Sequence, residues 1–179
     1  MKYLKPILIL IAFIWFVWII NFILPFELRN LGIQPRSLTG MRGILFHPFL
    51  HGDISHIISN SVPLFILLSV LFSFYTKVAT RVAIYSVLIG GALVWFFARD
   101  AVHIGASGLI YSLAAFLVAI SFYNFNIKSF LIALLIIVLY GGLVWGLLPV
   151  SVYISWEGHL FGAIAGVFLA WNYKNEATQ

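Results

Sequence analysis

The sequence predicts an all-α, polytopic membrane protein with a bundle of six transmembrane helices, and three observations support this fold class. Apolar residues make up 63% of the 179 residues and charged residues 8%, against roughly 45–50% and about 25% in soluble domains. Apolar runs of bilayer length recur between short polar breaks. These runs are apolar on all sides, whereas the strands of a membrane barrel alternate. The composition therefore excludes a soluble enzyme or a disordered chain and predicts a protein embedded in a lipid bilayer.

Each predicted helix is close to the ~20 residues that cross ~30 Å of hydrocarbon, and the third is the shortest. The six runs are 7–26, 54–75, 82–98, 104–122, 129–148 and 154–173. The first is long for a signal peptide and lacks a small-x-small cleavage site, so we interpret it as a helix. Residues 27–53 form a long outer loop, whose many Leu, Ile and Phe residues predict that it packs on the bundle at the membrane interface. The chain is expected to form a single domain, 1–179.

The distribution of Lys and Arg predicts the orientation of the bundle. An even number of spans puts both termini on one side of the membrane. That side carries six cations and the other carries four: Lys2, Lys5, Lys77, Arg81, Lys128 and Lys174 against Arg29, Arg36, Arg42 and Arg99. By the positive-inside rule both termini are cytoplasmic. The cations form no basic stripe, so nucleic acid is not an expected partner. The absence of cysteine excludes thiol nucleophiles.

Polar residues gather near the outer ends of the second, fourth and sixth predicted helices. The first turns of these helices place His56, Ser107 and His159 at about one depth. Polar groups inside a bilayer are costly, so this shared depth indicates a functional site. A hydroxyl beside an imidazole in a water-poor site is the minimum for nucleophilic catalysis. The available carboxylates are expected in loops or at the interface, which favours a Ser–His dyad: Asp53, Asp100 and Glu157.

Groups around this pair are placed to assist it. The backbone amides at the glycine-containing turn before Ser107 have no intrahelical acceptor and can face a developing oxyanion. Asn60 lies one turn below His56 on the same helix face and offers a side-chain donor. Tyr111 lies one turn below Ser107, where its ring can hold an imidazole by packing. A full G-x-S-x-G elbow is absent because Leu109 stands at its last position.

Three motifs resemble those of the rhomboid intramembrane serine proteases. Gly105-Ala-Ser107-Gly108, followed by Tyr111, resembles that family's nucleophile segment. The segment 51–60 is similar to its second-helix H-x(4)-H-x(3)-N signature, and 158–166 is similar to its sixth-helix motif of a histidine followed by two close-packing glycines. All three occur in order on the second, fourth and sixth helices. The resemblance covers essentially the whole chain, in the minimal six-helix bacterial form.

This resemblance implies a role for each site residue. Ser107 would be the nucleophile and His159 the base, and Tyr111 would pack against His159. The oxyanion hole would comprise His56, Asn60 and the amides around Gly105, Ala106 and Ser107. Gly162 and Gly166 would let the sixth helix close on the fourth near Gly108 and Ser112, as small residues do between membrane helices. The sequence departs from the family at Met41-Arg42, where the family often has Trp-Arg, and this affects the expected loop contacts.

The expected activity is cofactor-free and metal-free hydrolysis of peptide bonds in transmembrane segments of other membrane proteins. The expected location is the bacterial inner membrane, with the site toward the outer side. The glycine-rich end of the fifth helix, 141–149, is a candidate lateral gate. Two alternatives remain: a non-catalytic pseudoprotease that binds transmembrane helices, and a haem or metal protein using several histidines. His47 and His51 are expected to fix the loop by hydrogen bonds, and His103 to be a solvated interfacial residue.

Overall fold

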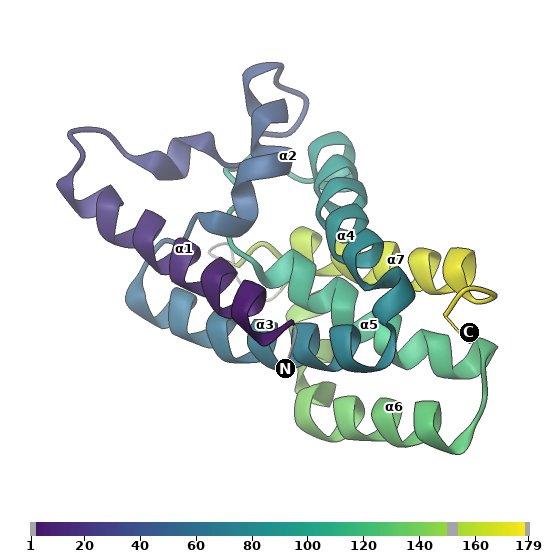
Figure 1. Ribbon diagram of the computed structural model, residues 1–179. Helices are drawn as coiled ribbons and strands as arrows, with labels where there is room; N and C mark the ends of the chain where they lie inside the picture. Colours follow the sequence, from purple (N-terminus) through teal and green to yellow (C-terminus); the bar gives the residue numbers. More distant parts are fainter. Residues whose placement is uncertain (1–2, 150–153, 178–179) are drawn as a thin grey trace.

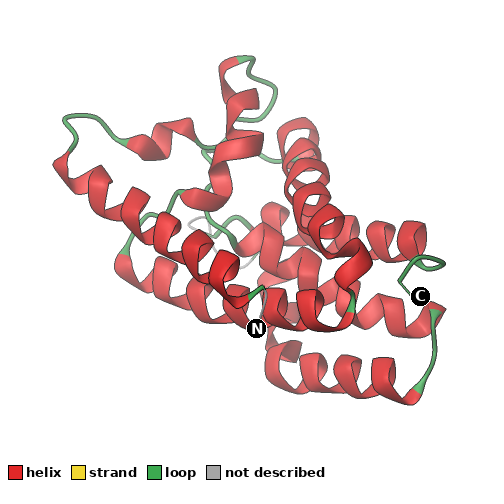
Figure 2. Ribbon diagram, viewed as in Figure 1, coloured by secondary structure: helices red, strands yellow, loops and turns green. Residues whose placement is uncertain are grey.

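The computed structural model describes residues 3–149 and 154–177, and these residues form a bundle of helices (Figure 1). The long helices are α1 (Leu4–Ile23), α3 (Ile54–Phe74), α4 (Thr76–Phe97), α5 (Ser107–Tyr123), α6 (Ile127–Tyr140) and α7 (Trp156–Tyr173). No strand occurs in these described ranges (Figure 2), although an isolated bridge pairs Ile33 with His103. The predicted all-α class is confirmed for this part of the chain. Lys2, which the sequence placed on the cytoplasmic side, lies outside the described residues.

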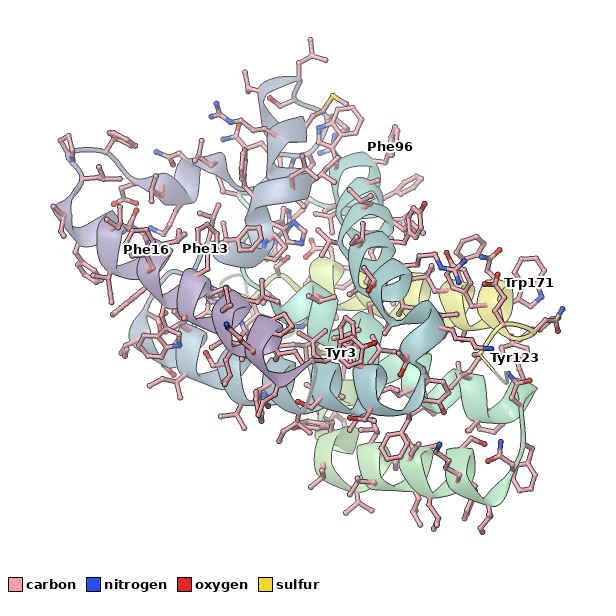
Figure 3. All side chains as sticks on the ribbon, viewed as in Figure 1. Tyr3, Phe13, Phe16, Phe96, Tyr123 and Trp171 are labelled. Atoms are coloured by element: carbon pink, nitrogen blue, oxygen red, sulfur yellow. The ribbon has the colours of Figure 1, made fainter. Side chains whose placement is uncertain are left out.

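Four of these elements are long and apolar enough to cross a bilayer. They are α1, α3, α4, and α6 together with the 3₁₀ helix η4 (Gly141–Leu147) that continues it. α5 is apolar but has 17 residues, and α7 carries Glu157 in its first turn. Large apolar side chains such as Phe96 and Trp171 are exposed and project outward from the bundle (Figure 3). Such a surface is stable in lipid rather than water, as expected for a polytopic membrane protein.

Several helix boundaries differ from the predicted ones, among them those of α4, α5 and α6. α4 begins at Thr76 rather than at residue 82, and its early cation Arg81 lies 4.7 Å from the centroid of the Tyr173 ring. α6 ends at Tyr140 rather than at residue 148, because glycines weaken an α-helix and the backbone tightens into η4. α5 begins at Ser107 rather than at residue 104, because Gly105 has a φ of 109° that no helix accommodates.

α5 is the central helix of the bundle. It lies among the other helices (Figure 1) and contacts α3, α4, α6 and α7. Its interface with α7 is the most extensive. Its side chains Leu113, Phe116 and Leu117 are fully buried. α1 lies at the edge and buries only Ile7 and Ile14 among its described residues. The nucleophile candidate therefore starts the helix whose position the rest of the bundle fixes most firmly.

Glycines allow α5 and α7 to approach until their backbones touch. A Cβ atom on Gly162 would meet the carbonyl oxygen of Gly108, and one on Gly166 would meet the carbonyl oxygen of Ser112. Gly162 and Gly166 thus face the two α5 residues that the sequence analysis paired with them. The Ser112 hydroxyl donates to Ser86 Oγ of α4 at 2.8 Å, so this buried polar group is satisfied. The approach brings the first turns of α5 and α7 together.

The loop 27–53 packs on the bundle, as predicted, through η1 (Leu28–Leu31), η2 (Thr39–Arg42), α2 (Gly43–Phe46) and η3 (His47–Phe49). Its main anchor is Arg36, which has a φ of 58°. The Arg36 amide donates to Trp95 O at 2.9 Å, and its guanidinium donates to Ala98 O at 2.7 Å. Trp95 Nε1 donates back to Ser37 O at 2.8 Å. Arg42 is exposed. Arg36, for which no such role was expected, makes these loop contacts instead.

Gly166→Ala should destabilise the bundle, because the new Cβ would overlap the Ser112 carbonyl, and main-chain atoms cannot rotate away. We expect a loss of about 1–3 kcal/mol, as for other overpacked interiors. Gly90→Ala is the matched control, since its Cβ would lie 3.6 Å from Gly162 Cα, an ordinary van der Waals distance. Thermal melting of both variants in detergent measures the difference. Equal melting temperatures would contradict the close-packing assignment.

Candidate active site

The candidate nucleophile Ser107 is the first residue of α5 and follows a turn that only glycine favours. Gly105 has a φ of 109°, and its amide donates to the carbonyl oxygen of His47 at 2.9 Å. This amide was expected in the oxyanion hole, but its bond to the His47 carbonyl already occupies it. The amides of Ala106 and Ser107 remain at the helix start, where N–H groups have no intrahelical acceptor. Gly105 therefore shapes the turn rather than offering a donor.

The candidate base His159 lies in the first turns of α7 and faces Ser107. Its Nε2 is 3.0 Å from Ser107 Oγ, and its Nδ1 is 2.8 Å from the carbonyl oxygen of Gly146 in η4. A carbonyl can only accept, so Nδ1 carries the proton and Nε2 is left as the acceptor for the Ser107 hydroxyl. Both ring nitrogens are thus engaged within the chain. This arrangement does not favour His159 as an axial haem ligand, which would need a free nitrogen.

Tyr111 holds the His159 ring from one side. The two rings are stacked, with centroids 4.2 Å apart and planes inclined by 5°. The Tyr111 hydroxyl donates to the carbonyl oxygen of Leu143 at 2.8 Å. η4 therefore fixes both members of the stack through main-chain carbonyls. A Cβ on Gly146 would overlap the Tyr111 hydroxyl and lie 3.1 Å from His159 Nδ1, which explains a glycine at this position.

His56 and Asn60 of α3 border the turn before Ser107. A Cβ on Gly105 would lie 2.6 Å from His56 Nε2 and 3.5 Å from Asn60 Nδ2. Both side chains therefore reach the glycine turn. Asp53 caps α3 by accepting from the His56 amide at 2.8 Å, which fixes the start of this helix. Two polar side chains of α3 thus border the turn that leads into α5.

Asn60 is also tied to the outer loop. Its Nδ2 donates to His51 Nε2 at 3.0 Å, and the His51 and His56 rings meet edge to face with centroids 4.9 Å apart. Burial, together with repulsion from His56, lowers the pKa of His51 to about 4. His51 is therefore neutral near pH 7, and Nε2 can accept from Asn60. The predicted role of His51 in fixing the loop to the second helix is confirmed.

The remaining histidine positions are buried rather than exposed. His47 Nδ1 bonds the carbonyl oxygen of Gly43 at 3.0 Å, and burial lowers the His47 pKa to about 4. The prediction for His103 was wrong, since its residue surface is 3% exposed rather than solvated. Glu157, which was expected in a loop or at the interface, lies in the first turn of α7, is 3% exposed and lies 3.5 Å from Arg99. Periodicity places these residues near the outer surface and cannot reveal what covers them.

No carboxylate hydrogen-bonds His159 among the described residues, and Gly146 O takes the position that an acid has in a triad. Asp53 is a helix cap, and Asp100 is exposed. Within the described ranges no three His, Asp or Glu side chains converge as a metal site. A cavity of about 20 Å³ adjoins Ser107, and its mainly apolar lining includes the polar residues His47, Ser86, His103 and Ser155. Its size suits a single water molecule.

The chain is similar to one protein-family model and to several bacterial proteins. A family model described as the Rhomboid domain matches residues 39–176, which include every residue of the candidate site. Uncharacterized proteins of Mycobacterium bovis and Mycobacterium tuberculosis are each 32% identical over 176 residues, covering 92% of this chain and 72% of the relative. An uncharacterized protein of Mycobacterium leprae is 31% identical over 178 residues, covering 92% of this chain and 69% of the relative.

Proposed function

Because the chain belongs to the rhomboid family, we propose that it is an intramembrane serine endopeptidase acting on transmembrane segments of other membrane proteins. The observation that carries the proposal is the distance of 3.0 Å between Ser107 Oγ and His159 Nε2, with Nδ1 held by Gly146. The protein would lie in a bacterial inner membrane with six spans, both termini cytoplasmic and the site toward the outer side. Activity should require neither metal nor cofactor.

In the proposed reaction Ser107 Oγ attacks the scissile carbonyl while His159 Nε2 removes its proton. The resulting imidazolium then gives this proton to the leaving amine, and an acyl-enzyme on Ser107 remains. Water, activated by the same imidazole, hydrolyses the ester and restores the hydroxyl. The stacked Tyr111 ring and the Gly146 carbonyl would keep the imidazole oriented through both steps. A small cavity that adjoins Ser107 has room for one water molecule.

The developing oxyanion would be stabilised by donors around the glycine turn. The amides of Ala106 and Ser107 are the main-chain candidates, and His56 with Asn60 supply side-chain donors that border Gly105. Donors fixed by the fold need not reorganise as charge develops, so they stabilise the transition state more than the ground state. Asn60 is held by its bond to His51, which supports a preorganised amide.

Substrate access requires local unwinding and a lateral opening. A peptide carbonyl in an α-helix is engaged and shielded, so segments weakened by Gly or Pro near the outer interface should be preferred. The family resemblance adds a preference for a small residue before the scissile bond. α6 and η4 form the candidate gate, because η4 replaces the α-helix near the dyad and has no buried residue. The alternative, a pseudoprotease, would bind such segments without cleaving them.

Ser107→Ala and His159→Ala should each lower the cleavage rate of a transmembrane reporter by at least about 10³-fold. The first removes the nucleophile, and the second removes the base without which a neutral hydroxyl is a poor nucleophile. Melting temperature should change little in Ser107→Ala, since Ala is small and favours helix. Ser121→Ala on the same helix is the control, since its hydroxyl donates to the Val118 carbonyl, away from the dyad. A fluorophosphonate should label the parent at Ser107. Parental turnover by Ser107→Ala would overturn the proposed function.

Asn60→Ala should lower kcat about tenfold, roughly 1.4 kcal/mol, with little change in KM if the amide acts on the oxyanion. A smaller effect than for a lone donor is expected, because His56 and the backbone share the same oxygen. Since Asn60 also bonds His51, melting temperature must be measured on the same preparation. A variant that melts early yet keeps its full kcat would assign Asn60 to the loop contact alone.

Gly146→Ala should reduce kcat about 10- to 100-fold, because the added methyl would displace Tyr111 and with it the His159 ring. Gly142→Ala places the same methyl in the same 3₁₀ helix, but in open space, and should stay within about threefold of the parent. Steady-state kinetics on both variants measures the difference. Similar kinetics of the two would show that Gly146 does not position the base.

A further inference from the structure

A cluster of four polar residues lies outside the dyad, where two segments of the chain meet. Arg99 and His103 belong to the connection between α4 and α5, and Ser155 and Glu157 belong to the start of α7. The side chain of Glu157 is 4% exposed, and His103 is 3% exposed. Burial of such groups is costly unless they are paired. The proposed reaction uses neither of them, so their burial needs another explanation.

Arg99 joins the two segments in two ways. Its Nε is 3.5 Å from Glu157 Oε1, and its Nη2 donates to the carbonyl oxygen of Ile154 at 2.8 Å. The arginine side chain is 34% exposed, whereas its acidic partner is buried, so the pair is only partly screened by solvent. The guanidinium therefore contacts both a side chain and the main chain of the segment that opens α7.

His103 makes a second link between the same segments. Its Nδ1 lies 2.6 Å from Ser155 Oγ, and its Nε2 lies 3.1 Å from the carbonyl oxygen of Arg99. The Arg99 carbonyl can only accept, so Nε2 carries the proton and the Ser155 hydroxyl donates to Nδ1. Burial lowers the pKa of His103, which keeps the ring neutral near pH 7. The His103 main chain exchanges two hydrogen bonds with Ile33 of the outer loop.

Each of the two segments leads directly into one half of the dyad. His103 precedes the Gly105 turn and Ser107 on the same stretch of chain. Ser155 O accepts from the backbone amide of His159 at 3.2 Å, and Glu157 lies in the first turn of α7. A shift of one segment against the other would therefore change the distance between Ser107 Oγ and His159 Nε2. Misplacement by about 1 Å can cost 10²-fold in rate.

We propose that Arg99, His103, Ser155 and Glu157 form a brace that positions Ser107 against His159, an inference that rests on the proposed protease function. The brace joins the two segments by an ion pair and by two hydrogen bonds to Ile154 and Ser155. Glu157 is a positioning residue and not a third member of the triad, because the nitrogen that a triad acid would hold bonds Gly146 instead. Loss of a triad acid would cost around 10⁴-fold, whereas loss of a brace contact should cost far less.

The competing explanation is that the Arg99–Glu157 pair serves folding alone. Breaking a buried pair destabilises a protein whether or not it positions a site, so melting temperature does not separate the two roles. The rate constant of correctly folded molecules does separate them. A second readout is the rate at which a small fluorophosphonate labels Ser107, because this reaction needs the dyad but no transmembrane substrate or gate.

The experiment compares Glu157→Gln, Arg99→Gln and the double variant with the parent in detergent. Glu176→Gln is the matched control, because it removes an acid paired with Arg81 elsewhere in the protein. For each protein we would measure kcat and KM on a transmembrane reporter, the labelling rate of Ser107, and the folded fraction by gel filtration and melting. Ser155→Ala, which removes only a hydroxyl, decides by the same criteria if the charge variants do not fold.

We expect Glu157→Gln and Arg99→Gln each to lower kcat and the labelling rate about tenfold, with KM within about twofold. The double variant should lose about as much as Arg99→Gln alone, since both single variants remove the same ion pair. Ser155→Ala should lose about threefold, and Glu176→Gln should match the parent. Parental kcat in folded Glu157→Gln and Arg99→Gln would overturn the brace, as would slow cleavage with parental labelling. Cleavage by Ser107→Ala would instead overturn the protease function itself.

Discussion

The close approach of α5 and α7 is the constraint on which the rest of the site depends. Gly162 and Gly166 place the α7 backbone against the carbonyls of Gly108 and Ser112. Two rigid helices in direct backbone contact have little freedom to slide, because every displacement meets main-chain atoms. The first turns of both helices are consequently fixed against each other. Ser107 begins one of these helices, so the hydroxyl–imidazole distance follows from a packing interface below it.

The site is held largely by main-chain carbonyls and neutral side chains. Gly146 O fixes the His159 tautomer, Leu143 O fixes Tyr111, and His47 O fixes the Gly105 turn. In a medium of low dielectric constant a neutral acceptor avoids the desolvation penalty of a carboxylate, which explains how an imidazole can be oriented without an acid. The buried charge of Glu157 lies beside the dyad rather than on it, and the partly solvated Arg99 balances this charge.

The segments nearest the dyad differ in how firmly they are held. Hydrogen bonds join the turn before Ser107 to the outer loop and to the start of α7, and α3 lies beside it. η4, in contrast, contacts the dyad through its carbonyls and has no buried residue of its own. Regions with few buried contacts open at low free-energy cost. The structure thus combines a firmly held turn before Ser107 with a neighbour that has few buried contacts, which the proposed protease would need in order to admit a helix laterally.

The sequence by itself determined the all-α class, the approximate helix positions and the shared depth of His56, Ser107 and His159, because hydropathy and helical period are local properties of the chain. It also predicted the facing pairs of Gly162 and Gly166. Only the tertiary structure decided that η4 supplies the partner of His159, that the Gly105 amide is occupied, that Arg36 anchors the loop, and that Glu157 and His103 are buried. Each of these facts depends on contacts between residues far apart in sequence. No local pattern encodes which segment covers another, since only the packing of the helices sets that choice.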